Sequence, residues 1–242
     1  MLELNRIYNM DCLEGMKLMD DCSVDCVVTS PPYNKHNKNG GGMVSAVVYD
    51  TYDDDLDEIE YQEWQVCILD ECFRVLKDGG CVFYNHKNRY VNGNMISPIE
   101  WLKKTKFNIR QEIIWDRRIA GNIRGWRFWN VDERLYWLQK GNPTELPPNV
   151  ASKSSIWRIR PQDKNKFKHP CGFPVELVMN CISVLDGKGK TVMDPFMGSG
   201  TTAMASLMCG HNYIGFEVSK TYCDMAIDRI KSETENRGGK LF

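Results

Sequence analysis

Short apolar runs alternate along the chain with longer stretches in which apolar residues recur about once per helical turn. The short runs predict strands at Arg6–Tyr8, Val24–Thr29, Cys81–Tyr84, Thr191–Asp194 and Asn212–Glu217. The longer stretches predict helices at Leu56–Lys77, Phe173–Leu185, Thr201–Cys209 and Thr221–Glu233. Strands that alternate with helices in this way are typical of an α/β fold with a mainly parallel sheet.

Three other segments complete the predicted pattern. The runs Phe107–Trp115 and Arg134–Leu138 predict a late antiparallel pair of strands. The dipeptide Gly79-Gly80 is expected to end the first long helix, because glycine commonly follows a helix C-terminus. The segment Asn142–Pro161 is rich in Pro, Asn and Ser, so we predict a loop there.

Length and composition indicate one folded unit over residues 1–242, because 42% of the residues are hydrophobic and can supply a full core. That content excludes an intrinsically disordered chain. The N-terminal segment Met1–Arg6 is not an apolar signal, and no apolar run reaches the roughly 18 residues of a membrane span. We therefore expect a cytoplasmic protein that does not associate with membranes.

The ten cysteines do not form a recognisable metal or disulfide pattern. No pair has the Cys-x-x-Cys spacing of zinc sites, and the closest pairs are Cys22/Cys26 and Cys67/Cys72. A chain of 28.0 kDa also has no need of disulfides to hold a small core together. We expect mostly buried, reduced thiols and no metal site.

The first candidate site is the segment Asp194–Thr202, which joins a predicted strand to a predicted helix. Gly198 and Gly200 lack Cβ atoms, so a ligand can approach the backbone closely, and the helix N-terminus offers free N–H groups. Glu217 ends the next predicted strand, where an acid can accept hydrogen bonds from ribose hydroxyls. These features predict a nucleoside site, although the spacing matches neither a dinucleotide fingerprint nor a P-loop. The alternative is an ordinary tight turn with a solvated glutamate.

The second candidate site is Thr29-Ser30-Pro31-Pro32-Tyr33, at the C-terminal end of a predicted strand. Open α/β sheets bind their ligands at that end of their strands. Two prolines remove two N–H donors and leave carbonyl oxygens available, and Tyr33 adds a flat ring. A planar heterocycle with an amino group fits such a site, because its NH2 donates two hydrogen bonds. The alternative is a turn that the prolines merely stiffen.

Together these motifs resemble the beta class of amino-group DNA methyltransferases, in which a Ser/Asp/Asn-Pro-Pro-aromatic motif precedes a Phe-x-Gly-x-Gly motif. Ser30-Pro31-Pro32-Tyr33 matches the first and Phe196–Gly200 the second. Asn9–Glu14 is similar to the family's Gly-Asp-Cys-Leu-Glu stretch, with Met10 in place of the usual glycine. Lys168–Pro174 is similar to the family's Lys-His-Pro-x-x-Phe-Pro segment. The likeness spans nearly the whole chain.

The resemblance implies a class I methyltransferase fold: a Rossmann-like, doubly wound sheet, circularly permuted, mostly parallel with one antiparallel strand. It implies catalysis by Ser30, Pro31, Pro32 and Tyr33, with Ser30 and the Pro31 carbonyl accepting the amine hydrogens of a flipped base that stacks on Tyr33. It also implies S-adenosylmethionine as cofactor, bound by Asp11, Cys12, Thr29, His169, Pro170, Asp194, Pro195, Phe196, Met197, Gly198, Ser199, Gly200, Thr201, Thr202, Glu217 and Val218. A buried core thiol at Cys12 and a structural histidine at His169 are the alternative interpretations of those two residues.

The resemblance leaves two target bases open. In this family a serine at the first motif position goes mainly with cytosine N4, and an aspartate goes mainly with adenine N6. Some family members with Ser-Pro-Pro-Tyr followed by Asn, as at Asn34 here, are thought to act on adenine. We favour cytosine N4, with adenine N6 as the alternative. A methyltransferase for RNA or protein, and a DNA-binding module without catalysis, are the more distant alternatives.

Charge is divided between two regions, although the formal net charge is only -1. Residues 50–78 hold eleven acidic residues against Arg74 and Lys77. Residues 85–169 hold 18 Lys and Arg against 7 Asp and Glu, a net charge of +11, with tryptophans interleaved. We predict double-stranded DNA as partner, bound through Arg117, Arg118, Arg124, Arg127, Arg158 and Arg160. A solvated basic face is the alternative.

The family position of residues 119–168 predicts a small target-recognition insertion there. Because this insertion is short, we expect either a short recognition sequence or a homodimer. The resemblance also implies a role in a restriction-modification system. The residues Gly40-Gly41-Gly42, behind the catalytic motif, predict a loop that closes over the flipped base or the DNA.

Overall fold

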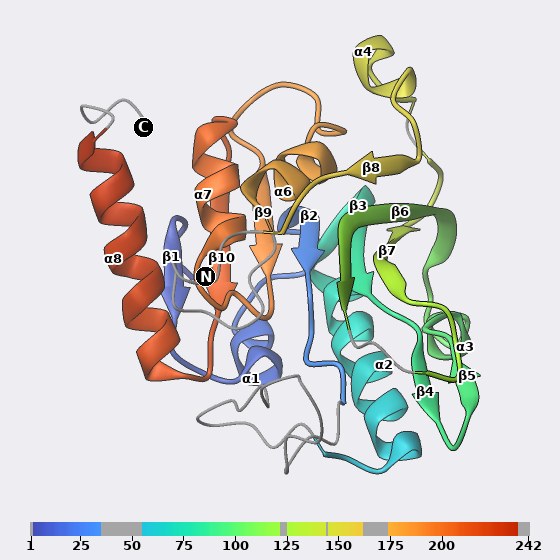
Figure 1. The fold of residues 1–242 in the computed structure, drawn as a ribbon. Helices are drawn as coiled ribbons and strands as arrows, with labels where there is room; N and C mark the ends of the chain where they lie inside the picture. Colours follow the sequence, from blue (N-terminus) through green and yellow to red (C-terminus); the bar gives the residue numbers. More distant parts are fainter. Residues whose placement is uncertain (1, 35–54, 122–124, 144, 162–173, 237–242) are drawn as a thin grey trace.

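A mixed sheet of eight strands organises the protein (Figure 1). The computed structural model describes residues 2–34, 55–121, 125–143, 145–161 and 174–236. In spatial order the strands are β1 (Arg6–Tyr8), β10 (Asn212–Phe216), β9 (Thr191–Asp194), β2 (Val24–Thr29), β3 (Leu76–His86), β7 (Asn130–Gln139), β6 (Asn108–Gly121) and β8 (Ile156–Arg158). Strands from the two ends of the chain therefore lie together at one side of the sheet.

The sheet is parallel except for β7. Every neighbouring pair from β1 to β3 is parallel, β7 runs antiparallel to both β3 and β6, and β8 is again parallel to β6. The expectation of a mostly parallel sheet with one antiparallel strand is confirmed. A separate antiparallel hairpin consists of β4 (Arg89–Val91) and β5 (Asn94–Ile96).

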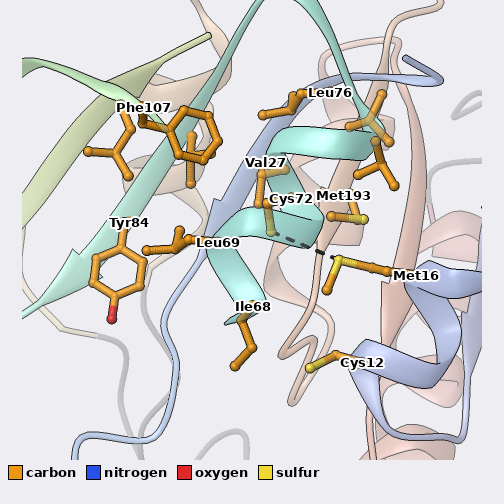
Figure 2. Close-up of a cluster of buried hydrophobic side chains, with 14 of the residues drawn as sticks. Cys12, Met16, Val27, Ile68, Leu69, Cys72, Leu76, Tyr84, Phe107 and Met193 are labelled. Carbon is orange, nitrogen blue, oxygen red and sulfur yellow. Dashed lines mark hydrogen bonds between the residues drawn. The ribbon is translucent and has the colours of Figure 1, made fainter. Parts of the chain in front are cut away.

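Helices cover both faces of the sheet, as expected for a doubly wound fold. Val27 of β2 belongs to a buried cluster with Met16 of α1 (Cys12–Lys17) and Leu69 of α2 (Glu58–Val75), shown in Figure 2. Val28 points to the other face, because successive strand residues alternate, and it clusters with Val178 of α6 (Val175–Ile182). The remaining helices are α3 (Ile99–Leu102), α4 (Pro148–Ala151), α7 (Thr201–Met208) and α8 (Lys220–Asn236).

The boundary between α2 and β3 differs from the prediction. The helix ends at Val75, before the glycines, because fully buried Leu76 leaves it to pair with Val24 of β2. The regular register resumes at Cys81 opposite Cys26, so the residues between form a bulge in β3. Gly79 has a φ of 78° there. The two glycines therefore permit a bulge in the strand and do not end the helix.

The region after residue 107 contains more strand than predicted. β6 and β7 are both longer than their apolar runs, and the predicted loop at 142–161 contains α4 and β8. β8 has three residues and joins the edge of the sheet by pairing Ile156 with Ile114. A strand of three residues is too short to show the alternation of apolar and polar residues from which strands are predicted. The segment 119–168, predicted as an insertion, includes β7, which lies within the sheet between β3 and β6.

Most described cysteines are buried, and all of them are free thiols, as expected. No helix among the described residues is long and apolar enough to cross a membrane. Within the same part of the chain, no three His, Cys, Asp or Glu side chains gather in a way that could hold a metal ion.

Candidate active site

The two predicted motifs meet at one edge of the sheet. β2 and β9 are parallel neighbours, so their C-terminal ends lie at the same edge (Figure 1). Thr29 ends β2 and Asp194 ends β9. The Thr29 hydroxyl donates a hydrogen bond of 2.9 Å to Asp194 Oδ1. The predicted catalytic motif and the predicted cofactor motif are thus linked through one buried carboxyl group.

Asp194 is only 1% exposed and has two further donors. Thr202 Oγ1 donates to Oδ2 at 2.6 Å, and the backbone N–H of Phe196 donates to Oδ1 at 3.0 Å. Burial raises the pKa of Asp194 to about 6, although all three hydrogen bonds act to lower it. In this structure Asp194, Thr29 and Thr202 serve as the frame of the site, since their polar groups bond to one another.

This buried carboxyl should make stability depend on pH between about 4 and 6. Its folded pKa lies above its ordinary value of 3.8, so its contribution is fully present below pH 4 and is lost as pH rises through 6. The difference corresponds to about 3 kcal/mol. Asp194→Asn is neutral at every pH and should not lose this contribution. We expect urea unfolding to show wild type losing about 3 kcal/mol relative to the variant between pH 4 and pH 7. A difference independent of pH would contradict this.

The loop between β9 and α7 depends on two glycines with positive φ. Gly198 has a φ of 51° and Gly200 a φ of 79°. A Cβ on Gly200 would lie 3.0 Å from Ala226 Cβ of α8, so the loop packs closely on that helix. The Gly198 N–H donates to Glu217 Oε2 at 2.8 Å, and the Ser219 N–H donates to Glu217 Oε1 at 2.9 Å. The glutamate after β10 therefore closes the glycine loop.

Other loop residues face inward. The Met197 side chain fills the space over Gly215, where a Cβ would lie 2.1 Å from Met197 Cε. Arg229 of α8 donates to the Ser199 carbonyl at 3.0 Å and to Thr201 Oγ1 at 3.2 Å. Sequence reasoning missed Arg229. Its only sequence signal is an arginine within an amphipathic helix, which ordinarily indicates a solvated face.

Phe196 and the turn after β1 border the same loop. Half-buried Phe196 packs edge-on against Trp64 of α2, with ring centroids 5.7 Å apart. Asn9 donates from Nδ2 to the carbonyls of Glu217 and Val218, at 2.9 and 3.0 Å. The predicted cofactor residues at the two ends of the chain are therefore neighbours.

Asp11 and Cys12 begin α1 beside that turn. Asp11 is the N-cap and accepts hydrogen bonds from the N–H groups of Leu13 and Glu14, at 2.8 and 3.2 Å. Cys12 is buried, and this burial raises the pKa of its thiol to about 12. The residue is therefore a neutral thiol. The predicted His169 and Pro170 lie outside the described residues, as does the predicted loop at 40–42.

The predicted catalytic motif forms a turn that hydrogen bonds hold from several sides. Ser30 Oγ and Tyr33 OH lie 3.0 Å apart, and Pro31 is buried. Tyr61 of α2 donates its hydroxyl proton to the Pro32 carbonyl at 2.7 Å. Asn34 has a φ of 51°, and its amide both donates to and accepts from the backbone of residue 56, at 2.8 Å each. These bonds fix the turn without using the Pro31 carbonyl.

Two side chains that sequence reasoning missed reach Tyr33. The Tyr33 hydroxyl donates to Glu133 Oε2 of β7 at 3.1 Å. Asn85 of β3 donates from Nδ2 to Glu133 Oε2 at 2.9 Å and also to the Tyr33 hydroxyl. Arg117 of β6 binds Glu133 Oε1 at 2.7 Å. Asn85 directly follows a predicted strand, which was an available signal, whereas Glu133 had none.

The predicted DNA-binding arginines gather on β6, β8 and the connection from β6 to β7. Arg118 and Arg158 are exposed. Arg158 of β8 lies opposite Asp116 of β6 in the strand register, and Asp116 precedes Arg117 and Arg118 along the chain. Arg160 is exposed just beyond β8, and Arg127 lies over the ring of Tyr90. Arg117 forms the ion pair with Glu133 described above, and Arg158 forms a longer one, of 3.7 Å, with Asp116. Arg124 lies outside the described residues.

The site combines an acceptor-rich turn with a glycine loop closed by a glutamate, both at the C-terminal edge of a doubly wound sheet. Such an arrangement is typical of enzymes that bring a nucleoside-containing cofactor to a polar substrate group. The chain belongs to the N6/N4 DNA methylase family, whose model matches residues 24–228. It is therefore a DNA amino-methyltransferase of the family that acts on cytosine N4 or adenine N6.

Relatives are similar over most of the chain. The type II methyltransferase M.HinfI of Haemophilus influenzae is 28% identical over 96% of this chain and 70% of its own length. The orphan methyltransferase M.BamHII of Bacillus amyloliquefaciens is 27% identical over 88% and 90%.

Solved structures share the fold. The PvuII DNA methyltransferase, described as cytosine-N4-specific, has a TM-score of 0.74 at 19% identity and covers 91% of this chain and 84% of its own. A DNA modification methylase from Thermus thermophilus, solved with S-adenosylmethionine, has a TM-score of 0.66 at 23% identity, covering 94% and 95%.

Proposed function

We propose that this protein transfers a methyl group from S-adenosylmethionine to the exocyclic amine of a base flipped out of double-stranded DNA, with cytosine N4 as the favoured target. The observation that carries the proposal is the bond between Thr29 and Asp194. It joins the turn that would hold the amine to the loop that would hold the methyl donor. Catalysis then follows from holding the two reacting atoms in line.

The residues around the glycine loop fit this cofactor. Two backbone N–H groups orient the Glu217 carboxylate, and a carboxylate is an acceptor that suits the hydroxyl donors of a ribose. The positive φ values of Gly198 and Gly200 expose backbone to the amino-acid portion, and Asp11 and Cys12 border the place of the adenine. When bound, S-adenosylmethionine supplies an activated methyl group.

Ser30 and Pro31 would hold the target amine. Conjugation with the ring makes an exocyclic amine a poor nucleophile, and acceptors that draw its two N–H groups out of plane restore its lone pair. The Ser30 hydroxyl oxygen and the Pro31 carbonyl supply two such acceptors on consecutive residues. No strong base is needed, because methyl transfer makes the nitrogen cationic and its proton then leaves readily.

The identity of the methylated base in the product distinguishes cytosine N4 from adenine N6 as the target. Purified protein is incubated with S-adenosylmethionine carrying a labelled methyl group and with DNA from methylation-free cells, and the digested DNA is analysed by mass spectrometry. We expect labelled N4-methylcytosine, because a neutral serine begins the motif at Ser30. Labelled N6-methyladenine alone would contradict the cytosine assignment and support the alternative. Label in neither base, with intact cofactor binding, would contradict the proposed reaction as a whole.

The arginines on β6 and β8 support a DNA face. Exposed Arg118, Arg158 and Arg160 lie there, and the turn between β6 and β7 carries the exposed aromatics Trp126, Phe128 and Trp129. Phe128 is 96% exposed, which is unusual for a large apolar side chain outside an interface. Basic side chains bind phosphates, and aromatic rings can stack on bases.

Removal of a phosphate-binding arginine should lower the salt dependence of DNA binding. We expect Arg158→Ala or Arg118→Ala to weaken binding and to reduce the slope of log K against log salt concentration by about one unit. Titration of a labelled duplex at several salt concentrations measures this. Arg6→Ala is the matched control, because Arg6 is an exposed arginine on β1, at the opposite edge of the sheet. Equal slopes for all three variants would contradict the assigned face.

A further inference from the structure

A chain of hydrogen bonds links the catalytic serine to a carboxylate on the antiparallel strand. Ser30 Oγ lies 3.0 Å from Tyr33 OH, and Tyr33 OH lies 3.1 Å from Glu133 Oε2. Arg117 holds the other oxygen, Glu133 Oε1, at 2.7 Å. Glu133 is 8% exposed, so solvent has little part in these contacts. The three residues Ser30, Tyr33 and Glu133 are called the serine–glutamate chain below.

The carboxylate of Glu133 determines which group donates in each hydrogen bond of the serine–glutamate chain. Glu133 forms an ion pair with Arg117, and a carboxylate can only accept hydrogen bonds. A phenol has a single proton, and Tyr33 must donate it to Glu133. Tyr33 therefore cannot donate to Ser30, so in the 3.0 Å contact the serine is the donor.

The contacts of Asn85 support the same assignment, with Ser30 as the donor to Tyr33. Asn85 Nδ2 lies within hydrogen-bonding distance of Glu133 Oε2, of the Tyr33 hydroxyl and, at the longest distance of 3.5 Å, of Ser30 Oγ. The two protons of the amide go to the two nearer oxygens, so the tyrosine oxygen acts as an acceptor. The opposite amide orientation would set Asn85 Oδ1 against the carboxylate, so the orientation follows from the charge of Glu133. Asn85 Oδ1 is buried and without a hydrogen-bond partner among the described residues, a cost that the contacts of Nδ2 offset.

We propose that Glu133 is a positioning residue that sets the hydrogen-bond direction of the catalytic motif. By taking the Tyr33 proton, it obliges Ser30 to donate toward Tyr33 and so to present its lone pairs to the substrate. A target amine can only donate, and it then meets an oxygen that is ready to accept. This inference rests on the proposed methyl transfer to an amine. Without the carboxylate, the Tyr33 hydroxyl would be able to donate to Ser30 and occupy the lone pair that the amine requires.

The first test is Glu133→Gln, which keeps the shape of the side chain and removes its charge. We expect the single-turnover methylation rate on unmethylated DNA to fall about 10- to 100-fold, as when a group that orients a reacting side chain is lost. The dissociation constant for S-adenosylmethionine should stay unchanged, because Glu133 does not contact the glycine loop. Glu112→Gln is the matched control, because Glu112 also pairs with an arginine between β6 and β7, at Arg134, and should keep the wild-type rate.

A double-mutant cycle with Tyr33→Phe separates positioning from a merely structural role. Without the hydroxyl the serine–glutamate chain is broken, so Glu133→Gln should lower the rate in wild type and leave the rate of Tyr33→Phe unchanged. Tyr33→Phe itself should keep measurable activity, because its ring remains and residue 33 can no longer donate a proton to Ser30. If the glutamine variant does not fold, Glu133→Asp replaces it; this variant keeps the charge but draws the carboxylate away from Tyr33.

Three outcomes would overturn the inference. They are a wild-type rate in the Glu133 variant, an equal loss in both backgrounds, and an inactive Tyr33→Phe protein that still binds cofactor. Failure of the proposed function looks different, because wild type itself would then leave DNA unmethylated.

Discussion

Gly198→Val is expected to abolish binding of S-adenosylmethionine while the fold survives. Gly198 has a φ of 51°, a conformation in which a β-branched residue is a strong outlier. The strain of roughly 1–3 kcal/mol would drive the loop into another conformation. That change would break the 2.8 Å bond from the Gly198 N–H to Glu217 and fill the space beside the backbone that the cofactor needs. Calorimetry should show affinity reduced by about 100-fold or more.

Gly187→Val is the matched control for this prediction. Gly187 also has a positive φ, of 73°, and a Cβ there would meet nothing within 4 Å. It precedes the N-terminal end of β9, whereas the glycine loop follows its C-terminal end. The control therefore carries similar backbone strain without touching the loop and should bind cofactor normally. Normal binding by Gly198→Val would show that the loop is not the cofactor site.

Ser30→Ala is expected to leave cofactor binding intact and to remove most turnover. The hydroxyl lies at the catalytic turn, bonded to Tyr33, and is separate from the bonds that shape the glycine loop. Loss of one oriented hydrogen-bonding group in an enzyme site typically lowers turnover by about 100- to 1000-fold. Labelled methyl incorporation into DNA measures the rate, and calorimetry measures the affinity for the cofactor.

Ser23→Ala serves as the control for the serine substitution. Ser23 immediately precedes β2, at the opposite end from Ser30, and its hydroxyl donates to the Asp20 carbonyl at 2.7 Å. Its loss should leave the rate unchanged. Turnover by Ser30→Ala near the wild-type rate would mean that the hydroxyl is not an acceptor for the amine. The Pro31 carbonyl would then have to act without it.

Sequence pattern predicted the parts of the site that depend on strand ends. β2 and β9 have the bounds expected from their apolar runs, and their last residues, Thr29 and Asp194, are joined by a hydrogen bond. The reason is physical: parallel strands bring their C-terminal ends to one edge, so any polar motif after each strand converges with the others.

The unpredicted parts come from side chains whose neighbours are set by the strand order. Glu133 reaches Tyr33 because β7 lies antiparallel beside β3, and Arg117 follows because β6 lies beside β7. Nothing in the local pattern around a glutamate on a strand reveals which neighbour it will face. Circular permutation and the target-recognition role of residues 119–168 stay predictions.

The bond from Thr29 to Asp194 joins residues 165 positions apart, and β1 pairs with β10 over a still larger separation. A ribosome releases the N-terminal half first, so the Ser30 turn leaves the ribosome long before the strand that completes it exists. We therefore expect the growing chain to have no competence for catalysis until its last strands are made. Methylation should begin only once β9 and β10 have been synthesised and have joined the sheet.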